Sequence, residues 1–105
     1  MDFDEYQRRA HACAVYPKEI GKSYTALALA GEAGEVANVV KKWMRGDFGE
    51  AELRRRLSGE LGGVLWYLAA LAAEMGFSLS EIAEGSIETV ERRRREGTTH
   101  GDGDR

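Results

Sequence analysis

The sequence predicts a single all-α domain of four helices. Apolar residues recur at helical spacing in four segments, and no stretch shows the alternation of β-branched and polar residues that is typical of strands. The only proline, Pro17, stands between the first two segments. A chain of 105 residues can form one compact core, but association with further copies would help it bury more apolar surface.

The first two predicted helices lie on either side of a short polar connection. The first runs from about residue 2 to residue 16, and Pro17 ends it because proline cannot donate a helical hydrogen bond. Its apolar face consists of Phe3, Tyr6, Ala10, Cys13 and Ala14. The second runs from about residue 24 to residue 43, before Arg45-Gly46-Asp47. Its apolar stripe consists of Leu29, Ala33, Val36, Val40 and Trp43.

The third predicted helix, from about residue 50 to residue 75, contains two adjacent glycines, Gly62 and Gly63. Each interior glycine costs about 0.5 to 1 kcal/mol relative to alanine. An apolar seam nevertheless continues on both sides of the pair, which favours one unbroken helix with a possible kink. The seam consists of Leu53, Leu57, Leu61, Val64, Leu68, Leu71 and Met75.

The fourth predicted helix begins at Ser78 and continues to about residue 95. Ser78 and Glu81 have the spacing of a capping box, in which each side chain accepts a hydrogen bond from the other residue's backbone amide. We expect the helical domain to span residues 1–96 and residues 97–105 to form a flexible, glycine-rich tail.

Composition excludes several classes of protein. A net charge of -3 argues against a stable nucleic-acid partner, although arginine runs at residues 54–56 and 92–95 require an explanation. No apolar run approaches the roughly 18 residues of a membrane span, and the acidic N-terminus lacks the features of a secretory signal. The single cysteine, Cys13, excludes an internal disulfide. We therefore expect a cytoplasmic protein without a membrane partner.

Three glutamates border the apolar faces of the second and third helices. Glu32 and Glu35 lie at the edge of one stripe, and Glu60 has the same relation to the seam of the next helix. Carboxylates that converge beside a core repel one another unless a cation is present. An all-oxygen set favours Mg²⁺ or Mn²⁺ over Zn²⁺. Periodicity alone gives equal weight to a second interpretation, in which these are boundary residues paired with lysine or arginine.

Basic and aromatic residues near the same edges are candidates for binding a nucleotide. Lys42 lies close to the edge that carries Glu35, and Arg93 lies beside the apolar stripe of the fourth helix. Both can bind phosphate, although for each residue alone the pattern slightly favours a long side chain that covers apolar surface with its charge in water. Trp43, Trp66 and Tyr67 can stack on a nucleobase, but helical aromatic residues more often belong to a core or interface.

Several motifs together resemble the MazG-like nucleoside triphosphate pyrophosphohydrolases. They are Leu29-Ala30-Gly31-Glu32-Ala33-Gly34-Glu35-Val36, Lys41-Lys42, Glu60-Leu61-Gly62 and Val64-Leu65-Trp66-Tyr67-Leu68. Residues 3–7, Tyr16-Pro17, Arg93 and residues 101–105 extend the resemblance over nearly the whole chain.

The resemblance implies an all-α, four-helix bundle completed by homo-oligomerisation, as a homodimer or homotetramer. It implies Mg²⁺-dependent hydrolysis of ribo- or deoxyribonucleoside triphosphates to monophosphates and pyrophosphate. The family holds the metal with E-E-x-x-E and E-x-x-D motifs on two adjacent helices. Carried over by position, Glu32, Glu35 and Glu60 are metal ligands, and Glu32 and Glu35 are also catalytic. Lys42 and Arg93 then bind the phosphates, and Tyr67 and Trp43 bind the base.

This chain departs from the family pattern at four positions. Gly31 replaces the first glutamate, as is common in the family, whereas Gly63 replaces the aspartate of E-x-x-D. Ser86 and Thr89 replace a usual asparagine and lysine of the fourth helix. The loss of a ligand at Gly63 supports an alternative, a nucleotide-binding or regulatory relative with weak or no catalysis. A third hypothesis, a purely structural oligomerisation module, requires the glutamates to be paired with arginines across an interface.

Overall fold

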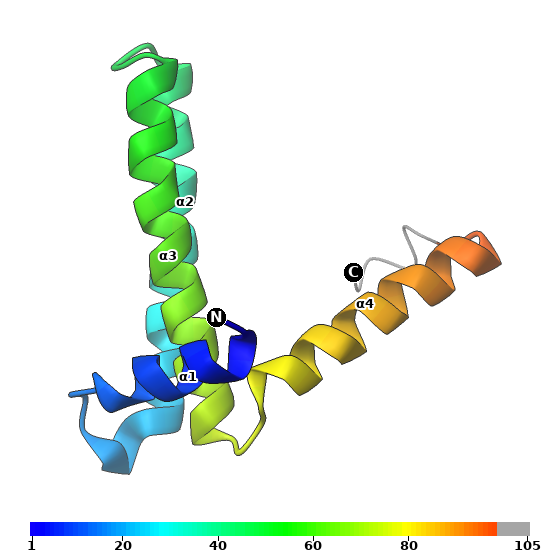
Figure 1. Cartoon of the computed structure of the whole chain (residues 1–105). Coiled ribbons are helices and arrows are strands. Elements are labelled where there is room, and N and C mark those ends of the chain that lie inside the picture. The colour runs from blue at the N-terminus through cyan, green and yellow to red at the C-terminus, as the bar shows by residue number, and fades with distance from the viewer. Residues whose placement is uncertain (99–105) are drawn as a thin grey trace.

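The computed structural model describes residues 1–98, and these residues form an all-α fold, as predicted (Figure 1). The elements are α1 (Phe3–Ala12), the 3-10 turn η1 (Lys18–Ile20), α2 (Gly21–Met44), α3 (Glu50–Glu74) and α4 (Leu79–Glu96). α2 and α3 form a long antiparallel hairpin. α1 crosses the base of this hairpin. α4 begins at the same base and projects away from the hairpin (Figure 1).

Hydrogen-bonding side chains begin two of the helices. The Asp2 carboxylate accepts a hydrogen bond of 2.8 Å from the Glu5 amide at the start of α1. At the start of α4, the Glu81 amide donates to Ser78 Oγ over 3.0 Å, and the Ser78 amide donates to Glu81 Oε1 over 3.2 Å. The predicted capping box is therefore confirmed. α4 ends at Glu96 and is capped by Gly97, whose φ of 73° suits glycine.

The prediction that the first helix extends to residue 16 was wrong, because α1 ends at Ala12. The chain turns after Cys13, and Tyr16 instead packs at the hairpin base with only 7% of its surface exposed. Its hydroxyl donates a hydrogen bond of 2.7 Å to Glu74 Oε2 at the end of α3. α2 also begins three residues earlier than predicted, at Gly21, directly after η1. A long-range contact therefore outweighs the local helical pattern here.

Two close contacts set the register of the α2–α3 hairpin. The Glu74 carboxylate occupies the space where a Cβ on Gly21 would lie. The Glu32 carboxylate does the same at Gly63, where a Cβ would lie 2.5 Å from Glu32 Oε2. Glu32 follows Gly21 by eleven residues, and Gly63 precedes Glu74 by eleven residues. The two helices therefore keep one antiparallel register, and α3 passes through both glycines as one helix, as predicted.

The buried residues of one chain are few and mostly small. Ala69, Ala70 and Ala72 are at most 3% exposed, at the base of the hairpin near the α1 crossing. Gln7 joins three elements here, because its side-chain amide donates to the Ala69 carbonyl over 3.3 Å and the Phe77 carbonyl over 3.0 Å, and accepts from the Leu79 amide over 3.0 Å.

Part of the predicted core remains on the surface of the single chain. In the apolar seam of α3, Leu61 is 52% exposed and Met75 is 47% exposed, so one chain does not bury the whole seam. α4 contacts α1 and α3 near the base, and its described residues make no contact with α2. The radius of gyration of 16.2 Å exceeds the roughly 13 Å of a compact domain of this length. One chain is therefore an open arrangement of helices.

No single helix within residues 1–98 has the length and apolar composition of a membrane span. α3 and α4 meet that criterion only as a pair, across a bend of 107°. The predicted tail at residues 97–105 lies almost wholly outside the described part of the chain.

The buried hydrogen bond of Tyr16 predicts a loss of stability in alkali. Burial, with the Glu74 hydrogen bond and charge, raises the pKa of Tyr16 from 10.0 to about 12. The unfolded chain therefore loses this proton first, and the free energy of unfolding falls by up to about 2 to 3 kcal/mol between pH 10 and pH 12. The fall attributable to Tyr16 should be absent from Tyr16→Phe. Urea unfolding of both proteins between pH 10 and pH 12 checks the difference. If the free energy of unfolding falls with pH equally steeply in both proteins, the prediction is contradicted.

Candidate functional site

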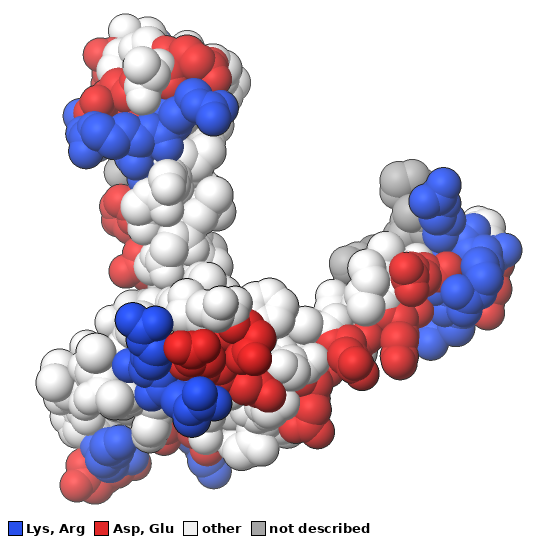
Figure 2. Space-filling model, in the orientation of Figure 1, with Lys and Arg blue, Asp and Glu red and all other residues white. Residues whose placement is uncertain are grey.

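The three predicted metal-binding glutamates lie along the middle of the hairpin. Glu35 follows Glu32 by three residues in α2, and Glu60 precedes Gly63 by three residues in α3. Because Glu32 lies against Gly63, the register places Glu35 and Glu60 at the same level of the hairpin, one turn closer to its tip. These are the only acidic residues that α2 and α3 contribute to this stretch. Figure 2 shows acidic side chains on one flank there.

The carboxylates of Glu32, Glu35 and Glu60 have no ion-pair partner among residues 1–98. Glu32 and Glu60 are half-buried, and Glu35 is exposed. The interpretation in which lysine or arginine neutralises them is therefore not borne out within one chain. The acids are not gathered around a common point either, because no three metal-ligating side chains in the described part of the chain are close enough to hold an ion.

Gly63 is explained by its contact with Glu32. With no side chain at position 63, the Glu32 carboxylate reaches across to the α3 backbone. An added Cβ would displace the flexible end of that side chain but no backbone atom. Nothing lies within 4 Å of a Cβ at Gly62, so the two adjacent glycines have different surroundings. The carboxylate oxygens of the three acids are the kind of ligand that a hard divalent cation takes, but the side chains are not arranged around such an ion within residues 1–98.

Tyr67 lies one turn from Gly63 on α3, on the base side of the acids. Burial raises the pKa of Tyr67, and its interactions with Tyr24 and Glu32 raise it further. Its ring meets that of Trp66 edge to face, with centroids 4.9 Å apart and planes at 82°. Tyr67, one of the predicted base-binding residues, therefore lies beside the acidic residues.

Trp43 and Lys42 lie on the other side of the acids, toward the tip of the hairpin. Trp43 is 37% exposed, and Lys42 is half-buried. The register places Trp43 about 22 Å along the hairpin from the level of Tyr67, at 1.5 Å per residue. Within one chain, the two predicted base-binding residues therefore cannot contact the same nucleobase.

Basic side chains form a collar just below the tip (Figure 2). The residues of this basic collar are Lys41, Lys42, Arg45, Arg54, Arg55 and Arg56. Part of its charge is balanced locally, because Glu52 accepts hydrogen bonds from Arg55 and Arg56, and the pKa of Glu52 is lowered to about 2. Arg45 pairs with Asp47, while Arg56 also lies over the Phe48 ring at 4.5 Å. Lys41, Lys42 and Arg54 have no ion-pair partner within residues 1–98.

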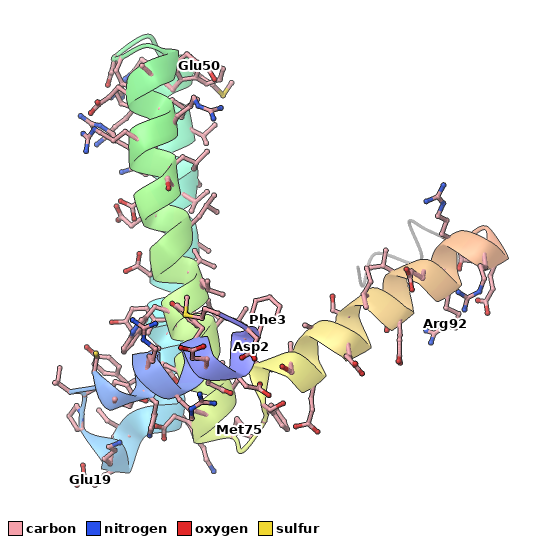
Figure 3. The ribbon with its side chains drawn as sticks, viewed as in Figure 1. Asp2, Phe3, Glu19, Glu50, Met75 and Arg92 are labelled. Carbon is pink, nitrogen blue, oxygen red and sulfur yellow. The ribbon has the colours of Figure 1, made fainter. Side chains whose placement is uncertain are left out.

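Arg93, the second predicted phosphate-binding residue, lies in the last turn of α4. Figure 3 shows the neighbouring Arg92 at the outer end of this helix, far from the hairpin. Since the described part of α4 does not contact α2, one chain does not bring Arg93 to the glutamates.

Comparison with known proteins identifies the family. The sequence pattern of the MazG nucleotide pyrophosphohydrolase domain matches residues 21–98, which cover α2, α3 and α4. The chain belongs to this family. The resemblance of the motifs is thus confirmed, and the match begins at the first residue of the hairpin.

A protein of similar length is also similar to this chain. It is the gene 37 protein of Mycobacterium phage L5, which is 38% identical over 112 residues, covering 99% of this chain and 98% of the phage protein. Its name indicates no activity. No solved structure matches the chain.

Tyr24 is a neighbour of the site that the sequence analysis did not single out. It lies on α2, two turns before Glu32, its ring stacks on that of Tyr16 with centroids 5.4 Å apart, and its presence helps to raise the pKa of Tyr67. The only sequence signal was its position on the predicted helix. The position of Tyr24 relative to α3 depends on the register, and the α3 residues that help to set it, Gly63 and Glu74, are far from Tyr24 in sequence.

Proposed function

We propose that this protein is a Mg²⁺-dependent nucleoside triphosphate pyrophosphohydrolase. It would use water to convert a ribo- or deoxyribonucleoside triphosphate into the monophosphate and pyrophosphate. The observation that carries the proposal is the set of glutamates without ion pairs, Glu32, Glu35 and Glu60, at adjoining levels of the hairpin in a member of this family. Family membership supports a nucleotide substrate and dependence on a divalent metal.

The carboxylates of Glu32, Glu35 and Glu60 would hold Mg²⁺, with Mn²⁺ as a substitute. The ion would orient a water molecule and neutralise charge that develops on the phosphates. Glu32 or Glu35 would accept a proton from the attacking water, which is the role of a general base. The acid that serves as base must have an oxygen not committed to the metal.

The order of residues along the hairpin supports one orientation of the nucleotide. Lys42 and the basic collar lie toward the tip from the glutamates, and Tyr67 lies toward the base of the hairpin. The phosphates would therefore point toward the tip, and the nucleobase would stack near Tyr67. In this arrangement Trp43 would contact only a nucleobase that is bound to a second copy.

We also propose that the active form is a homodimer or homotetramer. On α4, Ile87 is 53% exposed and Val90 is 45% exposed, and Leu27 on α2 is 74% exposed. On α3, Leu57 and Leu61 line an open hollow of about 300 Å³ with Arg54 and Ser58. A small protein stabilises such surfaces by association. A second copy could also supply its Arg93 to the glutamates of the first copy, because the α4 of the first copy does not bring its own Arg93 to them.

A second candidate function is nucleotide binding or regulation with weak or no catalysis. Gly63 favours it, because the aspartate of the family's E-x-x-D motif is missing and the Glu32 carboxylate lies against α3 in its place. Both candidates share the nucleotide and the metal, and they differ in turnover.

Pyrophosphate release from a panel of ribo- and deoxyribonucleoside triphosphates tests the enzymatic proposal. We expect Mg²⁺-dependent release, and we expect Glu35→Gln to lower turnover by at least tenfold because it removes a charged metal ligand. The matched control is Glu88→Gln on the exposed face of α4, which should retain wild-type turnover. No release at high protein concentration, with nucleotide binding intact, would establish the second candidate instead.

Substitution of Gly63 by aspartate tests the assignment of this position. Gly63→Asp should raise Mg²⁺ affinity and turnover severalfold, because it adds a hard oxygen ligand beside Glu32 and one turn from Glu60. Gly62→Asp makes the same chemical change where nothing lies within 4 Å, and should leave both quantities unchanged. Calorimetric Mg²⁺ titration of the two variants measures the difference. If Mg²⁺ affinity and turnover change equally in the two variants, position 63 does not belong to the metal site.

The proposed association can be tested at the exposed face of α4. Val90→Asp should shift sedimentation toward the monomer, because it introduces a charge where apolar surface would be buried. Arg92→Ser makes the same change in net charge on the opposite face of α4 and should sediment like the wild type. A monomeric wild-type protein at micromolar concentration would contradict this part of the proposal.

A further inference from the structure

Arg56, an arginine of the basic collar, lies on the same face of α3 as Glu60. It precedes Glu60 by four residues, which places it about 40° away around the helix and about 6 Å nearer the tip. Arg54 and Arg55 lie about 120° and about 140° from Glu60, on other sides of α3. Of these three arginines, Arg56 therefore continues the edge that carries Glu60 toward the tip. In Figure 2, basic side chains follow the acidic ones in this direction along the hairpin.

Two contacts hold the guanidinium group of Arg56 in place. Its Nε donates a hydrogen bond of 2.7 Å to Glu52 Oε2, and its Cζ lies 4.5 Å from the centroid of the Phe48 ring. Glu52 belongs to the first turn of α3, and Phe48 to the loop at the tip. The carboxylate and the ring restrict this long side chain before any ligand binds, which lowers the entropic cost of binding one.

These contacts leave the outer nitrogens of Arg56 unused. Within residues 1–98, neither its Nη1 nor its Nη2 donates a hydrogen bond, and its side chain is 42% exposed. By contrast, Arg55 donates from both Nε and Nη2 to Glu52. Arg45 donates from the same two atoms to Asp47. An ordered guanidinium group with free Nη atoms is suited to bind a phosphate through two parallel hydrogen bonds.

Glu52 does not cancel the charge of Arg56. This one carboxylate pairs with the guanidinium groups of both Arg55 and Arg56, which lower its pKa to about 2 and so keep it ionised. Two positive charges against one negative charge leave the cluster of Arg55, Arg56 and Glu52 with one positive charge. The cluster therefore still attracts an anion.

We propose that Arg56 binds the terminal phosphate of the nucleoside triphosphate and selects triphosphates over diphosphates. The inference rests on the proposed function, because it uses the orientation in which the base lies near Tyr67 and the phosphates point toward the tip. In that orientation the phosphate attached to the sugar lies nearest the glutamates, and the terminal phosphate lies nearest the collar. Arg56 thus holds the part of the substrate that leaves as pyrophosphate.

Binding of nucleotides with different numbers of phosphates tests this role. Calorimetric titration in the presence of Mg²⁺ measures Kd for the mono-, di- and triphosphate of one nucleoside, with a methylene bridge between the first two phosphates of the triphosphate to prevent hydrolysis. Arg56→Gln should raise Kd of the triphosphate about tenfold, because it removes hydrogen bonds between charged groups. It should change Kd of the mono- and diphosphate by less than about twofold, because neither reaches Arg56.

Arg9→Gln is the matched control. Arg9 also pairs with an acid four residues earlier, Glu5 at 3.8 Å, but it lies on α1 at the base of the hairpin. The same loss of charge there should leave all three dissociation constants unchanged. Two further variants examine the geometry. Arg56→Lys keeps the charge without the forked donors, and Phe48→Leu removes the ring beside the guanidinium group, so each should raise Kd of the triphosphate by less than Arg56→Gln.

An unchanged Kd of the triphosphate in Arg56→Gln would overturn the proposal. An equal rise for all three nucleotides would also overturn it, because that result means general electrostatic attraction and not contact with the terminal phosphate. Failure of the proposed function gives a different result. If the wild-type protein binds the nucleotides but releases no pyrophosphate, the enzymatic proposal fails, and the titrations still decide the role of Arg56. A wild-type protein that binds no nucleotide would overturn both.

Discussion

Two glutamates that each lie against a glycine of the opposite helix hold the hairpin in register. Glu74 of α3 lies over Gly21 of α2, and Glu32 of α2 lies over Gly63 of α3. Because the same number of residues separates the contacts on each helix, every other cross-hairpin pairing follows from these two. The level shared by Glu35 and Glu60 depends on this register.

The same register places residues of different chemical character at different distances from the base of the hairpin. Apolar packing and the Tyr16 hydrogen bond occupy the base, the acids lie at the middle, and the basic collar lies near the tip. A phosphorylated ligand with an aromatic base has a matching order of chemical groups. This agreement is the physical basis of the orientation proposed for the nucleotide.

Local sequence signals predicted those elements that depend on nearby residues. Ser78 and Glu81 identified the start of α4, and the apolar seam showed that α3 continues through Gly62 and Gly63. The end of α1 could not be predicted in this way, because Tyr16 leaves the helical pattern for a partner 58 positions away. The exposure of Leu61 was also missed, since helical periodicity shows which face is apolar but not what covers it. The sequence predicted the three acids as site residues from their place beside the apolar faces, whereas the contact of Glu32 with Gly63 could be recognised only from the register.

The fixed register also determines where the length of the chain can change. One residue inserted between Gly63 and Glu74 would rotate everything beyond it by about 100° and move it by about 1.5 Å, so that Glu60 would no longer lie level with Glu35. The same insertion in the loop between Met44 and Glu50 would leave every pairing below it intact. Relatives that keep this site should therefore vary in length at the hairpin tip and remain constant between the two glycine contacts.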